Sequence, residues 1–185
     1  TSNNTALIPD PTVTYTSANA TGSLAFTPVA DQNGTTTITV TVEDAGLDND
    51  IATTGDNASF SRTFDVVVTP VNSDPTLDPL SDLTIDEDAA QQTINLEGIT
   101  AGPLESQTLK VTATSDNTAL IPDPTVTYTS ANATGSLAFT PVADQSGTAT
   151  ITVTVEDAGL DNNLATTGDN ASFSRTVVVV ANPIN

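Results

Sequence analysis

Residues Thr35–Glu43 read TTTITVTVE, and this stretch decides the fold. Ile38, Val40 and Val42 alternate with threonines, so an extended chain would carry aliphatic side chains on one face and hydroxyl groups on the other. The β-branch of threonine suits the exposed face of a pleated sheet. Residues Thr148–Glu156 repeat the pattern. It predicts a half-buried antiparallel strand at both places.

The repetition extends far beyond this strand. Residues 1–72 and 114–185 align at a spacing of 113 positions, and 62 of the 72 aligned positions are identical. Periodic self-similarity on this scale is typical of arrays such as spacers, stalks, adhesins and filaments. The 41 residues Ser73–Ala113 precede the second copy only. We therefore expect a partial repeat at 1–72, lacking its first strands, and a complete repeat at 73–185.

Other short stretches with strand character are separated by turn signals, and no segment shows helical periodicity. Seven or so short strands in about 110 residues predict an all-β protein, a tandem Greek-key β-sandwich whose first bead is incomplete. The core would be aliphatic, with Phe139 and Phe173 as its largest members. The further strand candidates are Leu83–Ile85, Gln92–Leu96, Thr108–Thr114, Val126–Thr129, Gly135–Thr140 and Ser172–Ala181.

The composition argues against catalysis. The chain contains no Cys, Met, Trp or His, so disulfides, Cys/His zinc sites and nucleophile–imidazole catalysis are excluded. Paired carboxylates could hydrolyse glycosides, but five Phe and two Tyr offer few of the aromatic platforms that usually hold sugars. We expect no enzyme activity.

The net charge of −20 comes from 23 acidic and three basic residues, Arg62, Lys110 and Arg175. Too few cations are present to neutralise phosphates, which disfavours nucleic acid and anionic membrane surfaces as partners. No apolar run approaches the ~20 residues of a membrane span, so membrane insertion is not expected. Thr1 stands where a start Met would be, which indicates a processed product or a segment of a longer protein. Two interpretations of the acidity stay open: a solvated extracellular surface, or carboxylates that collect Ca²⁺.

Four motifs together resemble bacterial cadherin-like, Ig-like tandem repeats: GTATITVTVEDAGLDNN at 147–163, FSRTVVVVANPIN at 173–185, TPVNSDPT at 69–76 and LTIDEDAAQQTINL at 83–96. Such repeats occur in very long secreted surface proteins of bacteria. The resemblance covers essentially the whole chain. It implies an Ig/cadherin-like β-sandwich bead, an extracellular or bacterial cell-surface location, and a role in adhesion or as a spacer.

The resemblance also implies a Ca²⁺ site between beads. Glu87, Asp157 with its copy Asp44, and the linker residues Asn72 and Asp74 match the family's ligand positions, whereas Pro70 and Ser73 stand where acids are usual. The carboxylates also allow local sites, since Ca²⁺ takes six to eight oxygen ligands. A solvated loop is the alternative for each cluster. The local candidates are Asp86, Glu87 and Asp88, or Glu156, Asp157 and Asp161.

Six Asn-x-Ser/Thr tripeptides are candidate glycosylation sites, and glycans would solvate a surface fibre. They begin at Asn3, Asn19, Asn33, Asn57, Asn132 and Asn170. Arg62 and Arg175 alternate with Phe60 and Phe173, so each cation would share a face with an aromatic ring. We expect each Arg to pair with a carboxylate at the rim of the sandwich.

Ser73–Ala113 lies between two nearly identical pieces and could fold onto either of them. If it covers one piece, the other needs the equivalent segment of a neighbour, which would give head-to-tail strand donation between copies of the chain and a filament. The favoured function is an extracellular structural repeat that forms a fibre, stalk or adhesin spacer, with Ca²⁺ as a stiffening cofactor. The alternative is an adhesion module that binds glycans or another surface partner.

Overall fold

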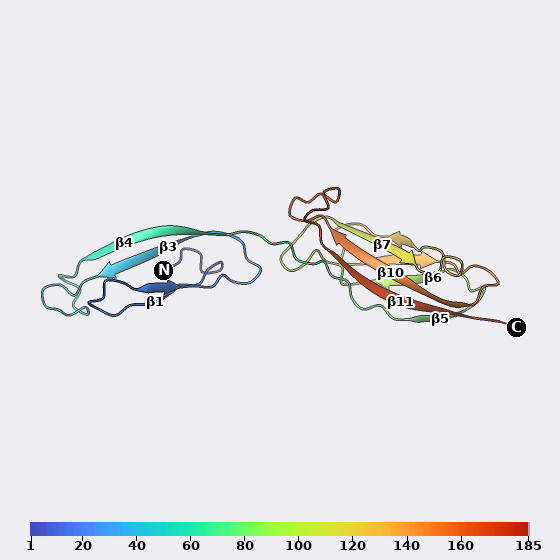
Figure 1. Ribbon diagram of the computed structural model, residues 1–185, viewed down its shortest axis with the longest axis horizontal. Coiled ribbons are helices and arrows are strands. Elements are labelled where there is room, and N and C mark those ends of the chain that lie inside the picture. Colours follow the sequence, from blue (N-terminus) through green and yellow to red (C-terminus); the bar gives the residue numbers. More distant parts are fainter. Residues whose placement is uncertain (185) are drawn as a thin grey trace. The chain divides into compact units, whose positions relative to one another are not determined.

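The computed structural model describes residues 1–184, which form eleven β-strands and no helix (Figure 1). Accordingly, no helix in that range could cross a membrane. The chain divides into two compact units, Thr1–Pro70 (unit 1) and Val71–Asn185 (unit 2). Their boundary lies two residues before the one expected from the sequence, so Val71 and Asn72 belong to unit 2.

Unit 2 is a sandwich of two sheets. One sheet has the strand order β5-β11-β10-β7 and the other β6-β9-β8. All neighbours are antiparallel except β5 and β11, which are parallel. The all-β sandwich fold predicted from alternation is confirmed. The strands are β5 (Leu83–Asp86), β6 (Gln92–Leu96), β7 (Leu109–Ser115), β8 (Thr125–Thr127), β9 (Gly135–Phe139), β10 (Gly147–Asp157) and β11 (Ser172–Asn182).

The core of unit 2 lies between these sheets. In β10, Ile151, Val153 and Val155 are fully buried, while the threonines between them are only partly covered. Leu96 of β6 and Leu137 of β9 contribute fully buried side chains from the opposite sheet. Burial of such side chains supplies most of the stability of a sandwich, at about 1.5–3 kcal/mol for each one fully removed from water. The period-two pattern thus fixes which face of β10 points inward.

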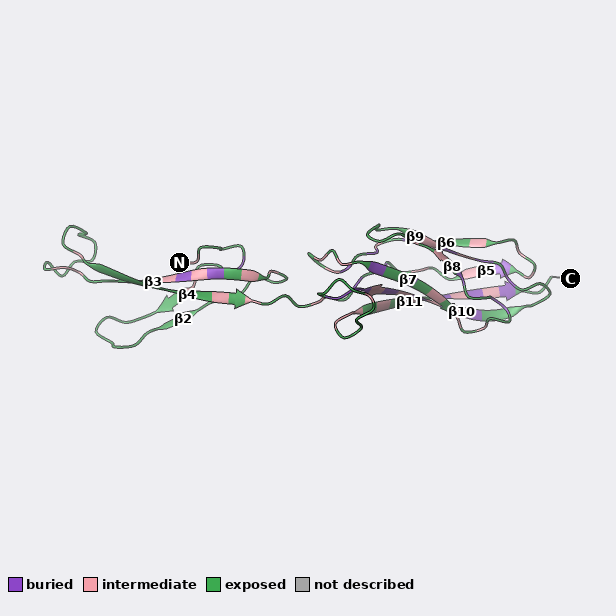
Figure 2. Cartoon of the chain, turned by 90° about the horizontal axis from the view of Figure 1, so that it is seen from above, coloured by how far each residue is buried: buried purple, intermediate pink, exposed green. Residues whose placement is uncertain are grey.

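Unit 1 has only the counterparts of β8–β11. These are β1 (Thr12–Thr14), β2 (Ser23–Ala25), β3 (Gly34–Glu43) and β4 (Ser59–Val68), paired as β1-β2 and β3-β4. The buried core consists of Leu7, Ile8 and Ile38. In Figure 2 the buried colour in unit 1 is largely confined to part of β3, whereas it recurs along several strands of unit 2.

Candidate functional site

Asp157 is the last residue of β10, and alternation places it on the inward face, in line with Val155. Its carboxylate therefore occupies a core position and is fully buried. Oδ1 accepts hydrogen bonds from the backbone N–H groups of Gly159 and Ala171, both at 2.9 Å, and from Nδ2 of Asn72 at 3.0 Å. Two of these donors come from the loop that follows β10, and the third comes from the N-terminal segment of unit 2.

The second carboxylate oxygen of Asp157, Oδ2, is buried and has no hydrogen-bond partner among the residues that the structure describes. No basic side chain of the described part of unit 2 neutralises it: the Lys110 ammonium lies 3.7 Å from Glu156, and Arg175 lies over the Phe173 ring. A buried ionised carboxylate without a compensating charge is costly, by several kcal/mol. Asp157 is thus a fully buried carboxyl group of which one oxygen has no hydrogen-bond partner within residues 1–184.

A chain of polar contacts surrounds Asp157. Gln107 Nε2 donates to Asn72 Oδ1 at 2.9 Å and to a Glu105 carboxylate oxygen at 3.2 Å. That carboxylate also accepts from the backbone N–H of Ser73 at 3.0 Å. Gln107 Oε1 is a second buried oxygen without a partner. We call Asn72, Glu105, Gln107 and Asp157 the Asp157 cluster.

The cluster matches the chemistry of a hard cation. Its oxygens come from two carboxylates and two amides, and the Asp169 carbonyl, which accepts from Asn72 Nδ2 at 3.0 Å, lies beside them. Ca²⁺ binds such a mixture of carboxylate, amide and carbonyl oxygens. Within residues 1–184 no group of three or more His, Cys, Asp or Glu side chains is placed to hold a metal ion. Neutral oxygens would therefore have to complete any Ca²⁺ coordination.

The structure brings together only some of the residues grouped by the resemblance. Asn72 and Asp157 are in contact, and Asp74, nearby in sequence, is exposed. Glu87 lies elsewhere: it follows Asp86, which pairs with Asn182 beside the start of β10. Asp157 ends that eleven-residue strand, about 30 Å away at the usual rise per residue. Within unit 2, β10 therefore separates Glu87 from Asp157, and a Ca²⁺ site between beads that uses both positions stays a prediction.

The acidic run Asp86, Glu87 and Asp88 fastens loops. The Glu87 carboxylate accepts from the backbone N–H of Ile184 at 2.9 Å, and Asp88 accepts from that of Asp144 at 2.9 Å. Asp86 is exposed at the end of β5. These carboxylates therefore hold separate backbone segments at this end of unit 2.

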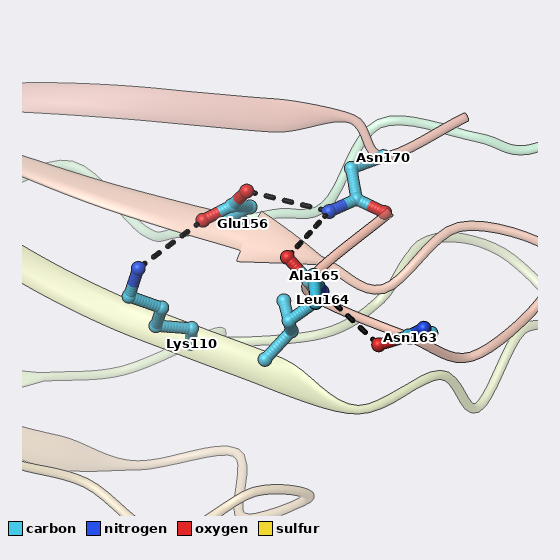
Figure 3. Close-up of polar contacts among 6 residues, drawn as sticks. All are labelled: Lys110, Glu156, Asn163, Leu164, Ala165 and Asn170. Atoms are coloured by element: carbon cyan, nitrogen blue, oxygen red, sulfur yellow. Dashed lines mark hydrogen bonds and ion pairs between the residues drawn. The ribbon is translucent and has the colours of Figure 1, made fainter. Parts of the chain in front are cut away.

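The second local group, Glu156, Asp157 and Asp161, also diverges. Glu156 points to the opposite face of β10, where it lies 3.7 Å from the Lys110 ammonium and accepts from Asn170 Nδ2 at 3.4 Å (Figure 3). Asp161 is exposed and accepts from the backbone N–H of Asn163 at 2.9 Å. Only Asp157 of this group belongs to the Asp157 cluster.

Asp44 of unit 1 is the counterpart of Asp157. Its Oδ1 accepts the equivalent bonds, from the backbone N–H of Ala58 at 2.9 Å and of Gly46 at 3.0 Å. These bonds, with Ala58 the larger contributor, hold the pKa of the Asp44 carboxyl below its usual range because they stabilise the charged form. Asp44 is exposed, however, and no described residue beside it corresponds to Asn72.

Glu105 and Gln107 were not predicted as site residues from the sequence. They flank Ser106 just before β7, and nothing in their spacing distinguishes them from an ordinary polar loop. The available signal was alternation: positions 105, 107 and 109 share a side of an extended chain, and Leu109 is buried. A polar residue in phase with a core position is thus a candidate for a buried polar contact.

The sequons lie in different surroundings. Asn19, Asn33 and Asn132 are exposed, as is Asn3, whose Oδ1 accepts from Thr36 and Thr37. Asn57 and Asn170 are half-buried, and each uses Nδ2, the atom that would carry a glycan, as a donor to a carbonyl and a glutamate. Modification of these two would displace the hydrogen bonds. Glycosylation stays a prediction.

The prediction of an Arg–carboxylate pair was wrong. The Arg175 guanidinium lies 4.8 Å from the centre of the Phe173 ring, and its Nε donates to the Leu77 carbonyl at 3.2 Å. Arg62 lies 4.9 Å from the Phe60 ring. In each unit the Arg and Phe stand two residues apart on one face of a strand, so the ring is the nearest surface for the cation.

No protein-family model matches the chain, and no curated protein sequence does either. Among solved structures, domains 4 and 5 of the S-layer protein SbsC match 98% of this chain and 69% of their own length, with 17% identity and a TM-score of 0.38. A PapD-like domain of human CEP192 matches 64% of this chain and 92% of its own length, with 11% identity and a TM-score of 0.37. A nucleoside hydrolase-related hypothetical protein from Saccharophagus degradans matches 61% and 26%, with 16% identity and a TM-score of 0.35. Matches at these values assign no function to the chain.

Proposed function

We propose that the chain is a non-catalytic structural repeat of an extracellular, bacterial cell-surface protein, a fibre, stalk or adhesin spacer whose complete bead binds Ca²⁺ at the Asp157 cluster. The observation that carries the proposal is the fully buried Asp157 carboxylate, which has no cationic partner in the described part of unit 2 and contacts Asn72 next to the unit boundary. The 113-residue period supports the array, and the acidic surface suits a secreted protein.

Calcium would act on the segment that follows unit 1. Asn72 and Ser73 reach the cluster through Asp157 and Glu105, so a cation there would hold Val71–Ser73 on unit 2 more firmly. Asn72 now presents its NH₂ group to Asp157, so its amide would have to turn to offer Oδ1 to a cation. A joint fixed in this way is stiffer than a free linker, which is the property that a stalk or spacer needs.

The alternative of a glycan-binding module has less support. Tyr15, Phe26 and Phe60 of unit 1 are exposed, as a sugar platform would be. Their counterparts in unit 2 pack against or within its core. The exposed rings are therefore explained as core residues of an incomplete bead. A glycan-array signal that is lost on changing one loop would favour the alternative.

The test is thermal unfolding in excess chelator and in millimolar CaCl₂, followed as two transitions assigned by hydrogen exchange. A ligand present at about 100 times its Kd stabilises the native state by about 2.7 kcal/mol. We expect Ca²⁺ to raise the melting temperature of unit 2 by several degrees, and Asp157→Asn to abolish the increase. Asp44→Asn is the matched control and should leave it unchanged.

Two outcomes contradict the Ca²⁺ part of the proposal. One is an identical melting temperature of unit 2 in chelator and in CaCl₂. The other is a Ca²⁺ effect that survives in Asp157→Asn, which would place binding elsewhere on the acidic surface. Replacing CaCl₂ by NaCl of equal ionic strength separates specific binding from screening.

A further inference from the structure

Equivalent side chains are buried differently in the two units. Val155 is fully buried, whereas its counterpart Val42 is 65% exposed. Phe139 is 4% exposed, whereas its counterpart Phe26 is 38% exposed. Ile38 and Ile151, by contrast, are both fully buried. Burial in unit 1 therefore decreases along β3 from Ile38 toward Val42, and β4 is exposed over most of its length.

In unit 2 the missing cover is supplied by Leu77–Ala113, which we call the donor segment. Its β7 pairs with the second half of β10, with Val111 opposite Val155. Its β6 pairs with β9, with Gln92 opposite Phe139. Its β5 adds a parallel edge to β11. The segment thus completes both sheets.

Unit 1 begins the same pairing and then stops. The bridge between Ser2 and Ile38 reproduces the pairing of Ser115 with Ile151 at the equivalent positions. The N–H of Thr39 donates to the Thr1 carbonyl at 2.8 Å. Beyond this point, Val40–Asp44 have no strand partner on that edge among residues 1–184. An exposed edge next to an apolar face is a site for strand addition.

A hollow of about 340 Å³ lies beside the paired strands β1 and β2. It adjoins Phe26, whose counterpart Phe139 pairs with Gln92 of β6 in unit 2. The residues that line it belong to the beginning of unit 1, to the end of β2 and to the two positions that follow β2. They are Pro9, Asp10, Thr12, Ala25, Phe26 and Thr27.

We propose that unit 1 is an acceptor for a polypeptide segment with the sequence of the donor segment, which would add three strands in the register seen in unit 2. Val111 would then lie opposite Val42, and Gln92 opposite Phe26. The inference concerns unit 1 and does not depend on Ca²⁺ binding, whose candidate residues lie in unit 2.

The numbers of donor segments and acceptor units indicate which polypeptide covers unit 1. Residues 1–184 contain one donor segment and two acceptors, since unit 1 and residues 114–184 both need cover. Exchange between identical copies would move the open face from one unit to the other and would leave one acceptor uncovered per chain. The occupant is therefore an additional copy of the segment.

A synthetic peptide of residues 71–113 tests the proposal when titrated into the full chain by calorimetry. We expect one peptide per chain and slower amide exchange in β2 and in Val40–Asp44. Val42→Asp should weaken binding at least about tenfold, because it places a charge where Val155 is buried in unit 2. Val29→Asp is the matched control: Val29 is 39% exposed and its counterpart Val142 is 36% exposed, so the donor segment does not cover this position.

Three outcomes overturn the proposal. The first is no binding at the highest soluble peptide concentration. The second is exchange protection or exposure confined to unit 2, which would mean displacement of the resident segment. The third is a dimer of the chain that excess peptide does not dissociate, which would mean that two open faces cover each other. Circular dichroism of Val42→Asp shows that the variant is folded, and a peptide carrying Val111→Asp gives an independent loss of binding.

Discussion

Units 1 and 2 share most of their sequence and yet differ in how well that sequence is buried. Ile38 and Ile151 are alike, but Val42 is 65% exposed where Val155 is fully buried. The strands themselves form in both units, and β3 and β10 start at equivalent positions. Alternation therefore suffices to specify a strand, whereas burial requires a second layer. The difference between the units measures what the donor segment contributes.

The largest expected effect comes from giving unit 1 its own donor segment. In a variant with residues 71–113 inserted before Thr1, the junction Ala113–Thr1 reproduces the native junction Ala113–Thr114. Each apolar side chain that becomes fully buried adds about 1.5–3 kcal/mol, so unit 1 should gain several kcal/mol of unfolding free energy. Denaturant unfolding followed by hydrogen exchange of β3 measures this.

The control for that experiment is the same insertion carrying Val111→Asp and Leu96→Asp. Both side chains are core residues of unit 2, so the altered segment should fail to pack on unit 1. Equal protection of β3 with both insertions would show that added length, and not pairing, stabilises unit 1. If neither insertion protects the amides of β3 from exchange, unit 1 does not accept the donor segment in the way that residues 114–184 do.

The next largest difference between the units is expected in the unfolding free energy that is lost when a core valine is truncated. Val155→Ala removes two buried methyl groups and should cost about 1–3 kcal/mol in the unfolding of unit 2. The equivalent change Val42→Ala should cost less than about 0.5 kcal/mol, because that side chain is already exposed. Chemical denaturation of each variant checks both values. A large loss for Val42→Ala would mean that unit 1 buries Val42 in solution.

Most of the fold could be predicted from local pattern. The strand predicted at 148–156 corresponds to β10 (Gly147–Asp157), and the one at 92–96 is identical to β6. The incomplete core of unit 1 could also be anticipated, because the 41 residues that precede the second copy have no counterpart before the first. These features follow from the alternation of apolar and polar residues and from the lengths of the two repeats, both of which can be read from a single sequence.

The candidate site was only half predictable. Asn72 and Asp157 lie in recognisable motifs, but Glu105 and Gln107 reach them through the tertiary fold, from a loop with no distinctive spacing. The position of Glu87 at the opposite end of β10 from Asp157 was not predictable for the same reason, because the sequence does not show at which end of β10 a neighbouring strand terminates. Contacts between segments far apart in the chain depend on topology, and topology is not encoded in local periodicity.

The number of Ca²⁺ ions bound should also differ between the original chain and the extended variant. The inserted segment 71–113 contains Asn72, Glu105 and Gln107, so on unit 1 it would bring these three residues toward Asp44. We expect the extended variant to bind one more Ca²⁺ than the original chain, and Asp44→Asn in that background to remove only the additional site. Calorimetric titration gives both stoichiometries. An unchanged stoichiometry in the extended variant, with β3 protected, would show that the Asp157 cluster is not sufficient for binding.

The smallest effect is a pH dependence of unit 1. The N–H groups of Ala58 and Gly46 donate to Asp44, and they hold its pKa below the usual range in the folded state. A carboxyl with a lowered folded pKa contributes stability above its unfolded pKa and loses it as the pH falls through the folded value. The contribution of Asp44 should therefore disappear in the acid range, below about pH 4. Because the carboxylate is exposed, the change should be slight.

Carboxyl-carbon NMR of Asp44 gives the pKa directly. Asp44→Asn should reduce the dependence of the unfolding free energy of unit 1 on pH in the acid range. If the Asp44 pKa is that of a free aspartate, the β3–β4 loop in solution does not form the backbone hydrogen bonds from Gly46 and Ala58 to Asp44.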